Sequence, residues 1–191
     1  MEAALKEWLK EKVSAPRYRH SLGVLDAACE LAGRHGVDQA PLKIAALVHD
    51  SARELPFDEM VALAEQWRLP VRDVDRIAPV LLHGRLGLEL VRREKGVEDP
   101  VVTSAVLYHT AGHPEMSLSD KVFFLADHIE PGRSYAHLKQ LRAAAFDDID
   151  QAMLMALDIN RDYLIGKGRP VDPDSLELRE ALLEAEGPDL G

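Results

Sequence analysis

The stretch Pro41-Leu42-Lys43-Ile44-Ala45-Ala46-Leu47-Val48-His49-Asp50 decides the predicted fold, because it is apolar around almost its whole circumference and then stops at two polar residues. A segment that is apolar on all sides is typical of a helix at the centre of a protein. Proline is well tolerated in the first turn of such a helix. The stretch therefore predicts a buried central helix whose carboxyl end carries an imidazole and a carboxylate.

The segments on either side also follow the helical spacing of apolar residues rather than strict alternation. Only 5% of the residues are aromatic, and no alternating β-branched runs occur between turn dipeptides, which argues against a β-sandwich. Helices are predicted at residues 3–13, 17–35, 41–50, 57–68, 72–82, 84–95, 99–109, 118–129, 134–145, 148–166 and 173–185. We expect an all-α fold, a compact helical bundle that forms one domain over residues 1–191.

Length and charge exclude several classes of protein. The 191 residues suffice for one sizeable core, and the net charge of -10 argues against a general nucleic-acid-binding role. No apolar run approaches the roughly 18–20 residues that cross a bilayer, and the amino terminus does not resemble a secretion signal. Cys29 is the single cysteine, so an intrachain disulfide is impossible and we expect a reducing, cytoplasmic setting without membrane contact.

Several apolar runs end in a histidine or an aspartate, and one further histidine lies on the inward face of the helix predicted at 17–35. Buried groups of this kind need partners, because an unpaired carboxylate is strongly destabilising inside a protein. A divalent cation, or two that share an oxygen ligand, would satisfy all of them, since imidazole nitrogens and carboxylate oxygens are the ligands that Zn, Fe, Mn and Co accept. The candidate ligands are His20, His49, Asp50, His83, His109 and Asp127.

The order of these residues resembles the HD-domain metal-dependent phosphohydrolase superfamily, over about residues 16–170. Five blocks are similar to the YqeK-type subfamily of symmetrical dinucleoside-tetraphosphate hydrolases: Arg17-x-x-His20-Ser21-Leu22-Gly23-Val24, His49-Asp50-x-Ala52-Arg53-Glu54-Leu55-Pro56, Leu82-His83-Gly84, Tyr108-His109-Thr110-x-Gly112 and Leu125-Ala126-Asp127-x-Ile129-Glu130-Pro131-Gly132-Arg133. The resemblance implies an HD-type helical fold and the symmetrical cleavage of diadenosine tetraphosphate into two ADP. One departure is Arg53, where lysine is expected more often; the positive charge is kept but the donor geometry changes.

The resemblance also implies a site with two divalent metal ions. One ion would be held by His20, His49, Asp50 and Asp127, and the second by His83 and His109, with Asp50 bridging the two. Asp50 and Asp127 are the expected catalytic residues, and a metal-bound hydroxide would attack a phosphorus atom of the substrate. The resemblance implies iron, whereas the ligand types alone leave Fe, Mn, Co and Zn open.

An acidic protein needs local positive charge to hold a polyphosphate. Arg17, Arg53 and Arg133 lie in the matched blocks, and guanidinium groups can engage phosphate oxygens through two hydrogen bonds, so these three form the predicted phosphate clamp. Further candidates for substrate contact are Thr110, His113 and Lys121.

Other functions stay open at this point. The same site could act on another nucleotide, such as a mononucleotide, a guanosine alarmone or a cyclic dinucleotide. Alarmone hydrolases of this superfamily carry an acidic pair shortly after His-Asp, which Ser51-Ala52-Arg53-Glu54 lacks. Cyclic dinucleotide phosphodiesterases carry a Gly-Tyr-Pro sequence there, and none follows His49-Asp50. A non-catalytic, metal-stabilised nucleotide-binding module is the alternative from another class. The helix at 173–185 is expected to pack on its own bundle, and a homodimer remains possible.

Overall fold

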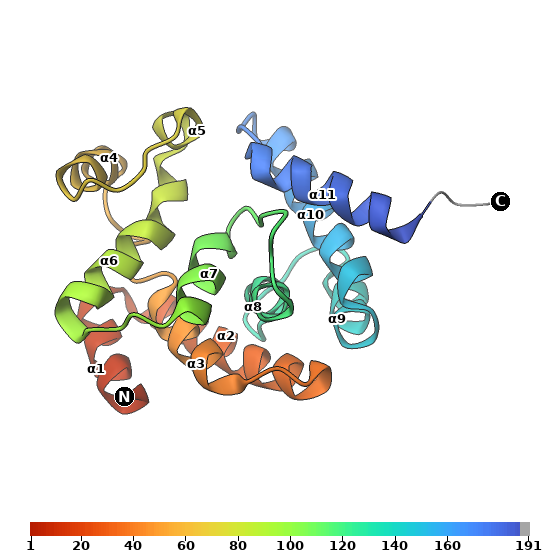
Figure 1. Cartoon of the computed structure of the whole chain (residues 1–191), viewed down its shortest axis with the longest axis horizontal. Helices are drawn as coiled ribbons and strands as arrows, with labels where there is room; N and C mark the ends of the chain where they lie inside the picture. Colours follow the sequence, from red (N-terminus) through yellow and green to blue (C-terminus); the bar gives the residue numbers. More distant parts are fainter. Residues whose placement is uncertain (188–191) are drawn as a thin grey trace.

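Residues 1–187 are described by the computed structural model, in which helices are joined by short loops and no strand occurs (Figure 1). The elements are α1 (Glu2–Lys12), α2 (Ala15–His35), α3 (Gln39–Val48), α4 (Phe57–Gln66), α5 (Asp73–Ile77), the 3-10 helix η1 (Pro79–Leu82), α6 (His83–Lys95), α7 (Pro100–Tyr108), α8 (Leu118–Ile129), α9 (Leu138–Asp147), α10 (Ile149–Gly166) and α11 (Pro173–Glu186). The all-α class predicted from the sequence is confirmed. Residues 188–191 of the predicted domain lie outside the described residues.

Local signals fix the bounds of the long helix α2. The Ser14 side chain accepts a hydrogen bond from the Arg17 backbone N–H, which satisfies a donor that the first turn leaves free. At the other end Gly36 adopts a left-handed conformation with φ 70°, which glycine reaches without steric strain. The cap predicted at Gly36 is therefore present, and the helix presents His20 toward the interior.

The central helix of the bundle is α3, as its sequence predicts. Its residues Leu42 and Ala45–Val48 are fully buried, and it packs against α2, α7 and α8. The α8 side of this core contributes Phe123 and Phe124, which are also fully buried. None of the helices within residues 1–187 combines the length and the apolar character that a membrane span requires.

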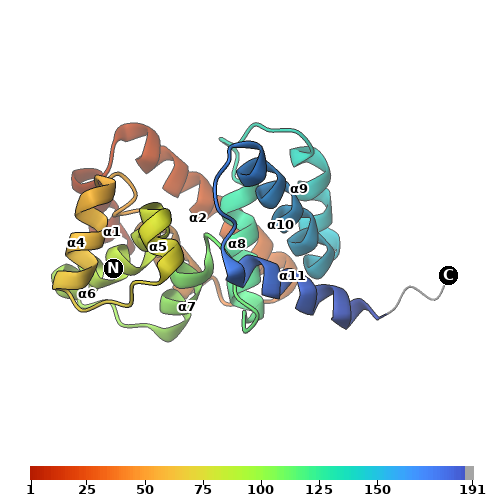
Figure 2. The ribbon, with the colours of Figure 1, turned by 90° about the horizontal axis from the view of Figure 1, so that it is seen from above.

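Two groups of helices flank this centre on opposite sides. The segment α4–α6 has a small core of its own, formed by Ala52, Met60, Ala64, Leu82 and Leu86. The segment α9–α11 lies across from it, and Figures 1 and 2 show the two groups apart in both views, with α7 and α8 between them. The polar ends of the central helices open toward the space between the two groups.

Two predicted helices differ from the structure. The helix expected at 72–82 is divided into α5 and η1, because Pro79 disfavours helical geometry at Ala78, whose φ and ψ are -128° and 75°. The helix expected at 134–145 begins only at Leu138, after His137 with φ 67°. Residues 134–137 instead extend the loop that carries Arg133.

Candidate metal centre

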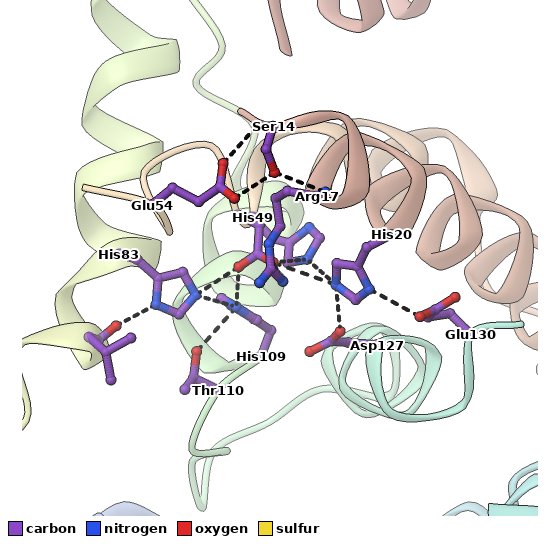
Figure 3. A network of polar contacts seen from close by, with 12 residues as sticks. Ser14, Arg17, His20, His49, Glu54, His83, His109, Thr110, Asp127 and Glu130 are labelled. Atoms are coloured by element: carbon purple, nitrogen blue, oxygen red, sulfur yellow. Dashed lines mark hydrogen bonds and ion pairs between the residues drawn. The ribbon is translucent and has the colours of Figure 1, made fainter. Parts of the chain in front are cut away.

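Four imidazoles and two carboxylates from five parts of the chain converge between the flanking groups of helices (Figure 3). His20 lies within α2 and Asp127 within α8, whereas the other ligand candidates sit at helix ends. His49 and Asp50 follow α3, His83 begins α6, and His109 follows α7. The polar ends of the apolar runs therefore meet in space.

Contacts between the ring nitrogens and the carboxylates are short. His20 Nε2 lies 3.1 Å from Asp127 Oδ1 and 3.5 Å from Asp50 Oδ2. On the other side of the cluster His83 Nε2 lies 3.1 Å from Asp50 Oδ1. His109 Nε2 lies 4.0 Å from the same oxygen. The two oxygens of Asp50 thus face two different sets of histidines.

The arrangement divides into two candidate ion sites that share Asp50. One group consists of His20, His49 and Asp50, the other of Asp50, His83 and His109, and the possible ligand atoms within each group lie within 4.8 Å of one another. Asp127 joins the first group through its contact with His20. A shared carboxylate between two sets of imidazoles is the donor chemistry of a two-metal site.

The other ring nitrogen of each histidine faces an acceptor. Nδ1 of His49 lies 3.0 Å from the Ala46 carbonyl and Nδ1 of His109 lies 2.6 Å from the Val106 carbonyl. His83 Nδ1 contacts the Val80 carbonyl in the same way, three residues back along the chain. Because a carbonyl can only accept, these Nδ1 atoms carry a proton, and in the neutral form of each ring the Nε2 lone pair points into the cluster.

These orientations fit bound cations. His83 Nε2 and His109 Nε2 lie 2.9 Å apart, and with both protons on Nδ1 neither nitrogen can donate to the other. Two converging lone pairs are satisfied by a positive ion rather than by each other. Burial, together with the imidazoles of His83 and His49, lowers the pKa of His109 to about 3, so the ring is neutral and able to bind a metal at physiological pH.

Glu130 orients the remaining histidine. Its Oε1 lies 3.2 Å from His20 Nδ1, and the carboxylate is almost fully buried, with 4% of the residue exposed. Its other oxygen accepts from the Gly132 backbone N–H. A carboxylate that accepts from the far nitrogen of a ligand histidine fixes the ring and raises its basicity. Sequence reasoning quoted Glu130 in a matched block but assigned it no role; an acid directly after a ligand-bearing helix was the available signal.

Charge holds both aspartates in the ionised form. Burial alone would raise the pKa of Asp50, but the imidazoles of His49 and His83, when protonated, lower it well below its usual value. Asp127 behaves in the same way, because Arg133 and His20 outweigh the burial that would raise its pKa. Both carboxylates are therefore available as anionic ligands.

A cleft of about 950 Å³ opens beside the cluster. Asp50, His83, His109 and Asp127 line it, and so do four of the predicted substrate-binding residues: Arg17, Arg53, Thr110 and Arg133. Its volume lies near the upper end of the usual range for small-molecule sites, which is about 300–1,000 Å³. The cleft is large enough for an extended ligand and not only for a metal centre.

The three arginines of the predicted phosphate clamp differ in how many hydrogen bonds and ion pairs they already form with protein groups. Arg17 Nη1 donates to Asp50 Oδ2 at 2.7 Å, while its Nε is buried without a hydrogen-bond partner among the described residues. Arg133 donates to the Asp127 side chain and, at 2.8 Å, to its backbone carbonyl. Arg53 forms no ion pair within residues 1–187; burial lowers its pKa, and the nearby charges of Arg17 and Arg169 act in the same direction.

Two further candidates are not brought to this cleft. His113 stacks on Tyr108, with ring centroids 4.6 Å apart, and lines a separate pocket of about 340 Å³. Lys121 pairs with Asp150 at 2.6 Å and does not line the cleft. Arg169, by contrast, lines the cleft although sequence reasoning did not select it, because nothing in its local sequence indicates the distant helices that it faces.

Comparison with known proteins agrees with this geometry. The family model of the HD domain matches residues 17–132. The chain belongs to the HD-domain family. An HD-superfamily hydrolase from Clostridium acetobutylicum, described as involved in NAD metabolism, has a similar structure: the TM-score is 0.92 at 35% sequence identity, over 97% of this chain and 98% of that one.

Two curated relatives share most of their length with this HD-domain chain. A protein of Bacillus subtilis is 37% identical over 167 residues, which are 87% of this chain and 89% of the relative. A protein of Halalkalibacterium halodurans is 36% identical over 175 residues, 92% of this chain and 93% of the relative. Both are named bis(5'-nucleosyl)-tetraphosphatase, symmetrical.

Proposed function

We propose that this protein is a metal-dependent phosphoanhydride hydrolase that cleaves diadenosine tetraphosphate symmetrically into two molecules of ADP. The names of its relatives support the substrate and the position of cleavage. The observation that carries the proposal is the shared carboxylate of Asp50, which lies between two sets of Nε2 atoms in a cleft lined by arginines. We further propose a cytoplasmic enzyme with a small-molecule substrate; its homodimer stays a prediction.

Each ligand has a proposed place. His20, His49, Asp50 and Asp127 would hold one divalent ion, and His83 with His109 would hold the second, with Asp50 shared by both. Iron is the proposed metal, on the family resemblance. When bound, two such ions supply a water of lowered pKa and stabilise negative charge on the attacking and leaving oxygens.

The arginines would hold the polyphosphate. Arg53 has no carboxylate partner within residues 1–187, and Arg17 keeps a buried Nε without a partner, so both retain donors for phosphate oxygens. Arg133, which pairs with Asp127, would contact an oxygen next to the reacting phosphorus. Arg17 and Arg133 already pair with Asp50 and Asp127, so Arg53 is the arginine of this set whose charge has no carboxylate partner among the described residues, and a polyanionic ligand would supply one.

The test is the product pattern of purified protein loaded with iron or manganese and incubated with diadenosine tetraphosphate. We expect ADP as the sole nucleotide product, and in water enriched in oxygen-18 a single labelled oxygen on the β-phosphate of one ADP of each pair. AMP with ATP would indicate another scissile bond, and turnover of a mononucleotide or a cyclic dinucleotide instead would contradict the substrate assignment.

A further inference from the structure

The cleft beside the metal centre has two walls of different chemistry. One wall comes from the start of α4 and from the α5–η1 segment, with Phe57 and Ile77 among its lining residues. The other comes from α10, with Asn160 and Tyr163. Figures 1 and 2 show α4 and α5 on one side of the molecule and α10 on the other, so these walls face each other across the ends of the central helices.

The first wall presents large apolar side chains to solvent. Phe57 is 58% exposed and Ile77 is 72% exposed, whereas few other large apolar side chains among the described residues are exposed. Val80 and Leu81 continue the same wall. Exposed apolar groups that line a cleft are typical of a binding surface, because a ligand that covers them removes apolar area from water. This wall offers contact area but no hydrogen-bonding side chain.

The second wall offers both a ring and an amide. Asn160 and Tyr163 are three residues apart on α10, a spacing that places them on one face of the helix. Tyr163 is 55% exposed, and the Asn160 side chain has no hydrogen-bond partner among the described residues. The Lys167 ammonium lies over the Tyr163 ring, 6.0 Å from its centroid, which leaves the opposite face of the ring for stacking. A stacking surface beside an unpaired amide is suited to a planar group with hydrogen-bonding edges.

The arginines that line the cleft lie away from this wall. Asp158 and Asp162 line the cleft on either side of Asn160, and both pair with Arg161, which does not line the cleft. The arginines that do line the cleft belong to α2, to the loops after α3 and α8, and to the α10–α11 connection. Because Arg161 is held by these two carboxylates, the wall formed by α10 directs no positive side chain into the cleft for a phosphate to bind. A purine carries no net charge near neutral pH, so the base is the part of a nucleotide that fits there.

We propose that α10 forms a base-reading nucleoside subsite, in which Tyr163 stacks on an adenine and the Asn160 amide pairs with its edge, while the wall of Phe57 and Ile77 holds the second base by apolar contact alone. This inference rests on the proposed function, because it requires a ligand with two nucleosides on either side of the metal centre. The two halves of a symmetrical substrate would thus bind in unlike surroundings.

An asparagine amide distinguishes adenine from guanine. It can donate to N7 of adenine and accept from the N6 amino group at the same time. Guanine presents two acceptors, O6 and N7, on that edge, so one of them faces the amide oxygen. A bidentate pair of this kind is worth about 10- to 100-fold in discrimination. The apolar wall has no comparable means of choosing a base.

The experiment compares kcat/KM for diadenosine, adenosine–guanosine and diguanosine tetraphosphates. The mixed substrate places adenine at α10 in only one of its two orientations, whereas diadenosine tetraphosphate does so in both. We therefore expect kcat/KM of the mixed substrate to be about half that of diadenosine tetraphosphate. Diguanosine tetraphosphate must place guanine at α10, and we expect it to be about 10- to 100-fold slower. Equal values for the two symmetrical substrates would overturn the inference.

Single substitutions test which residues cause the preference for adenine over guanine. Asn160→Ala should bring the three substrates to within about threefold of one another, and Tyr163→Ala should raise KM for each of them. Phe57→Ala should raise KM by the same factor for all three, with kcat unchanged. Ile165→Ala is the matched control, because Ile165 lies on α10 and is 62% exposed but does not line the cleft; it should change nothing.

The failures of the two proposals are distinguishable. If wild-type protein forms no ADP from diadenosine tetraphosphate, the proposed function fails. If ADP forms but Asn160→Ala lowers kcat/KM for every substrate by one common factor, the function stands and the base-reading role fails. Titration of ADP and GDP into the metal-loaded protein gives a readout without turnover: Asn160→Ala should weaken ADP binding at one site and leave GDP binding unchanged.

Discussion

At the scale of single residues, the partners of the imidazoles matter as much as the imidazoles. Three of the four candidate ligand histidines donate to a carbonyl three residues back along the chain, so the helix ends that carry them also orient them. His20 lies inside α2, where the carbonyls are used by the helix itself, and it depends on Glu130 from the end of α8.

Glu130 should therefore act as a positioning residue for metal binding. Glu130→Ala removes the acceptor of His20 Nδ1 and should weaken metal binding by about 10- to 100-fold. Glu130→Gln keeps an oxygen that can accept a hydrogen bond from His20, so its metal affinity should lie between those of Glu130→Ala and the wild type. Competition with a chromogenic chelator measures the affinity, and circular dichroism checks that each variant folds. Wild-type affinity in Glu130→Ala would disprove the positioning role.

Asp50 should be the ligand whose loss affects both ions. Its two oxygens face different sets of histidines, so Asp50→Asn removes a negative charge from both sites at once. We expect fewer than two ions per chain by elemental analysis and hydrolysis that falls to background. Asp26→Asn, at an exposed position of α2, is the control and should keep both. An active variant with a full metal complement would contradict the bridging assignment.

At the scale of elements, the second pair of histidines depends on how closely α6 approaches α7. A Cβ atom on Gly84 would lie 2.8 Å from the Val106 carbonyl oxygen, the same oxygen that accepts from His109. Gly84→Ala should therefore push the two helices apart, destabilise the protein by about 1–3 kcal/mol and weaken binding at the site of His83 and His109.

A glycine elsewhere provides the comparison for this substitution. Gly33 lies in α2, and its nearest neighbour would be 3.6 Å from an added Cβ, which is ordinary contact. Gly33→Ala should stabilise the protein by about 0.5–1 kcal/mol through helix propensity. Thermal unfolding and metal content of both variants are the measurements. If the Gly84→Ala protein binds two ions and unfolds at the same temperature as the Gly33→Ala protein, the close approach of α6 and α7 is unimportant for stability and metal binding.

The helices themselves were predictable because their apolar spacing is local information. Likewise His49, His83 and His109 could be selected as candidates because each directly follows an apolar run or begins the next helix. The cleft walls could not, because Phe57 and Tyr163 become neighbours of one ligand only through the packing of distant helices. The helix predicted at 72–82 is divided because the effect of Pro79 on Ala78 outweighs the apolar spacing around it.

At the scale of the whole molecule, one arginine joins the two flanking groups of helices. Arg72, just before α5, pairs at 2.6 Å with both Asp172 and Asp174 at the start of α11. It also contacts Asp75, whose side chain is fully buried and which Arg85 reaches at 2.6 Å. The network therefore ties the start of α5 to the start of α11, next to the cleft that Asp172 lines.

Replacing Arg72 should lower the free energy of unfolding at neutral pH. Arg72→Met leaves the buried carboxylates of Asp75 and Asp172 with less compensation, and loss of one partner of a buried ion pair destabilises a protein by about 3–5 kcal/mol. Arg76→Met is the matched control, because the side chains of Arg76 and its partner Glu65 are each 53% exposed and such pairs contribute less than about 1 kcal/mol. Urea denaturation of chelator-treated protein measures both differences.

The same network gives a pH dependence of defined sign. Burial alone would raise the pKa of Asp75, but Arg72 and Arg85 lower it below its ordinary value. The stability that this shift contributes is present above the unfolded pKa of about 3.9 and is lost as the pH falls through the lower folded pKa. The difference in unfolding free energy between wild type and Arg72→Met should therefore be largest near pH 7 and should shrink below about pH 4. A difference that stays constant with pH would mean that Arg72 stabilises the protein through packing of its aliphatic stem and not through the charge of Asp75.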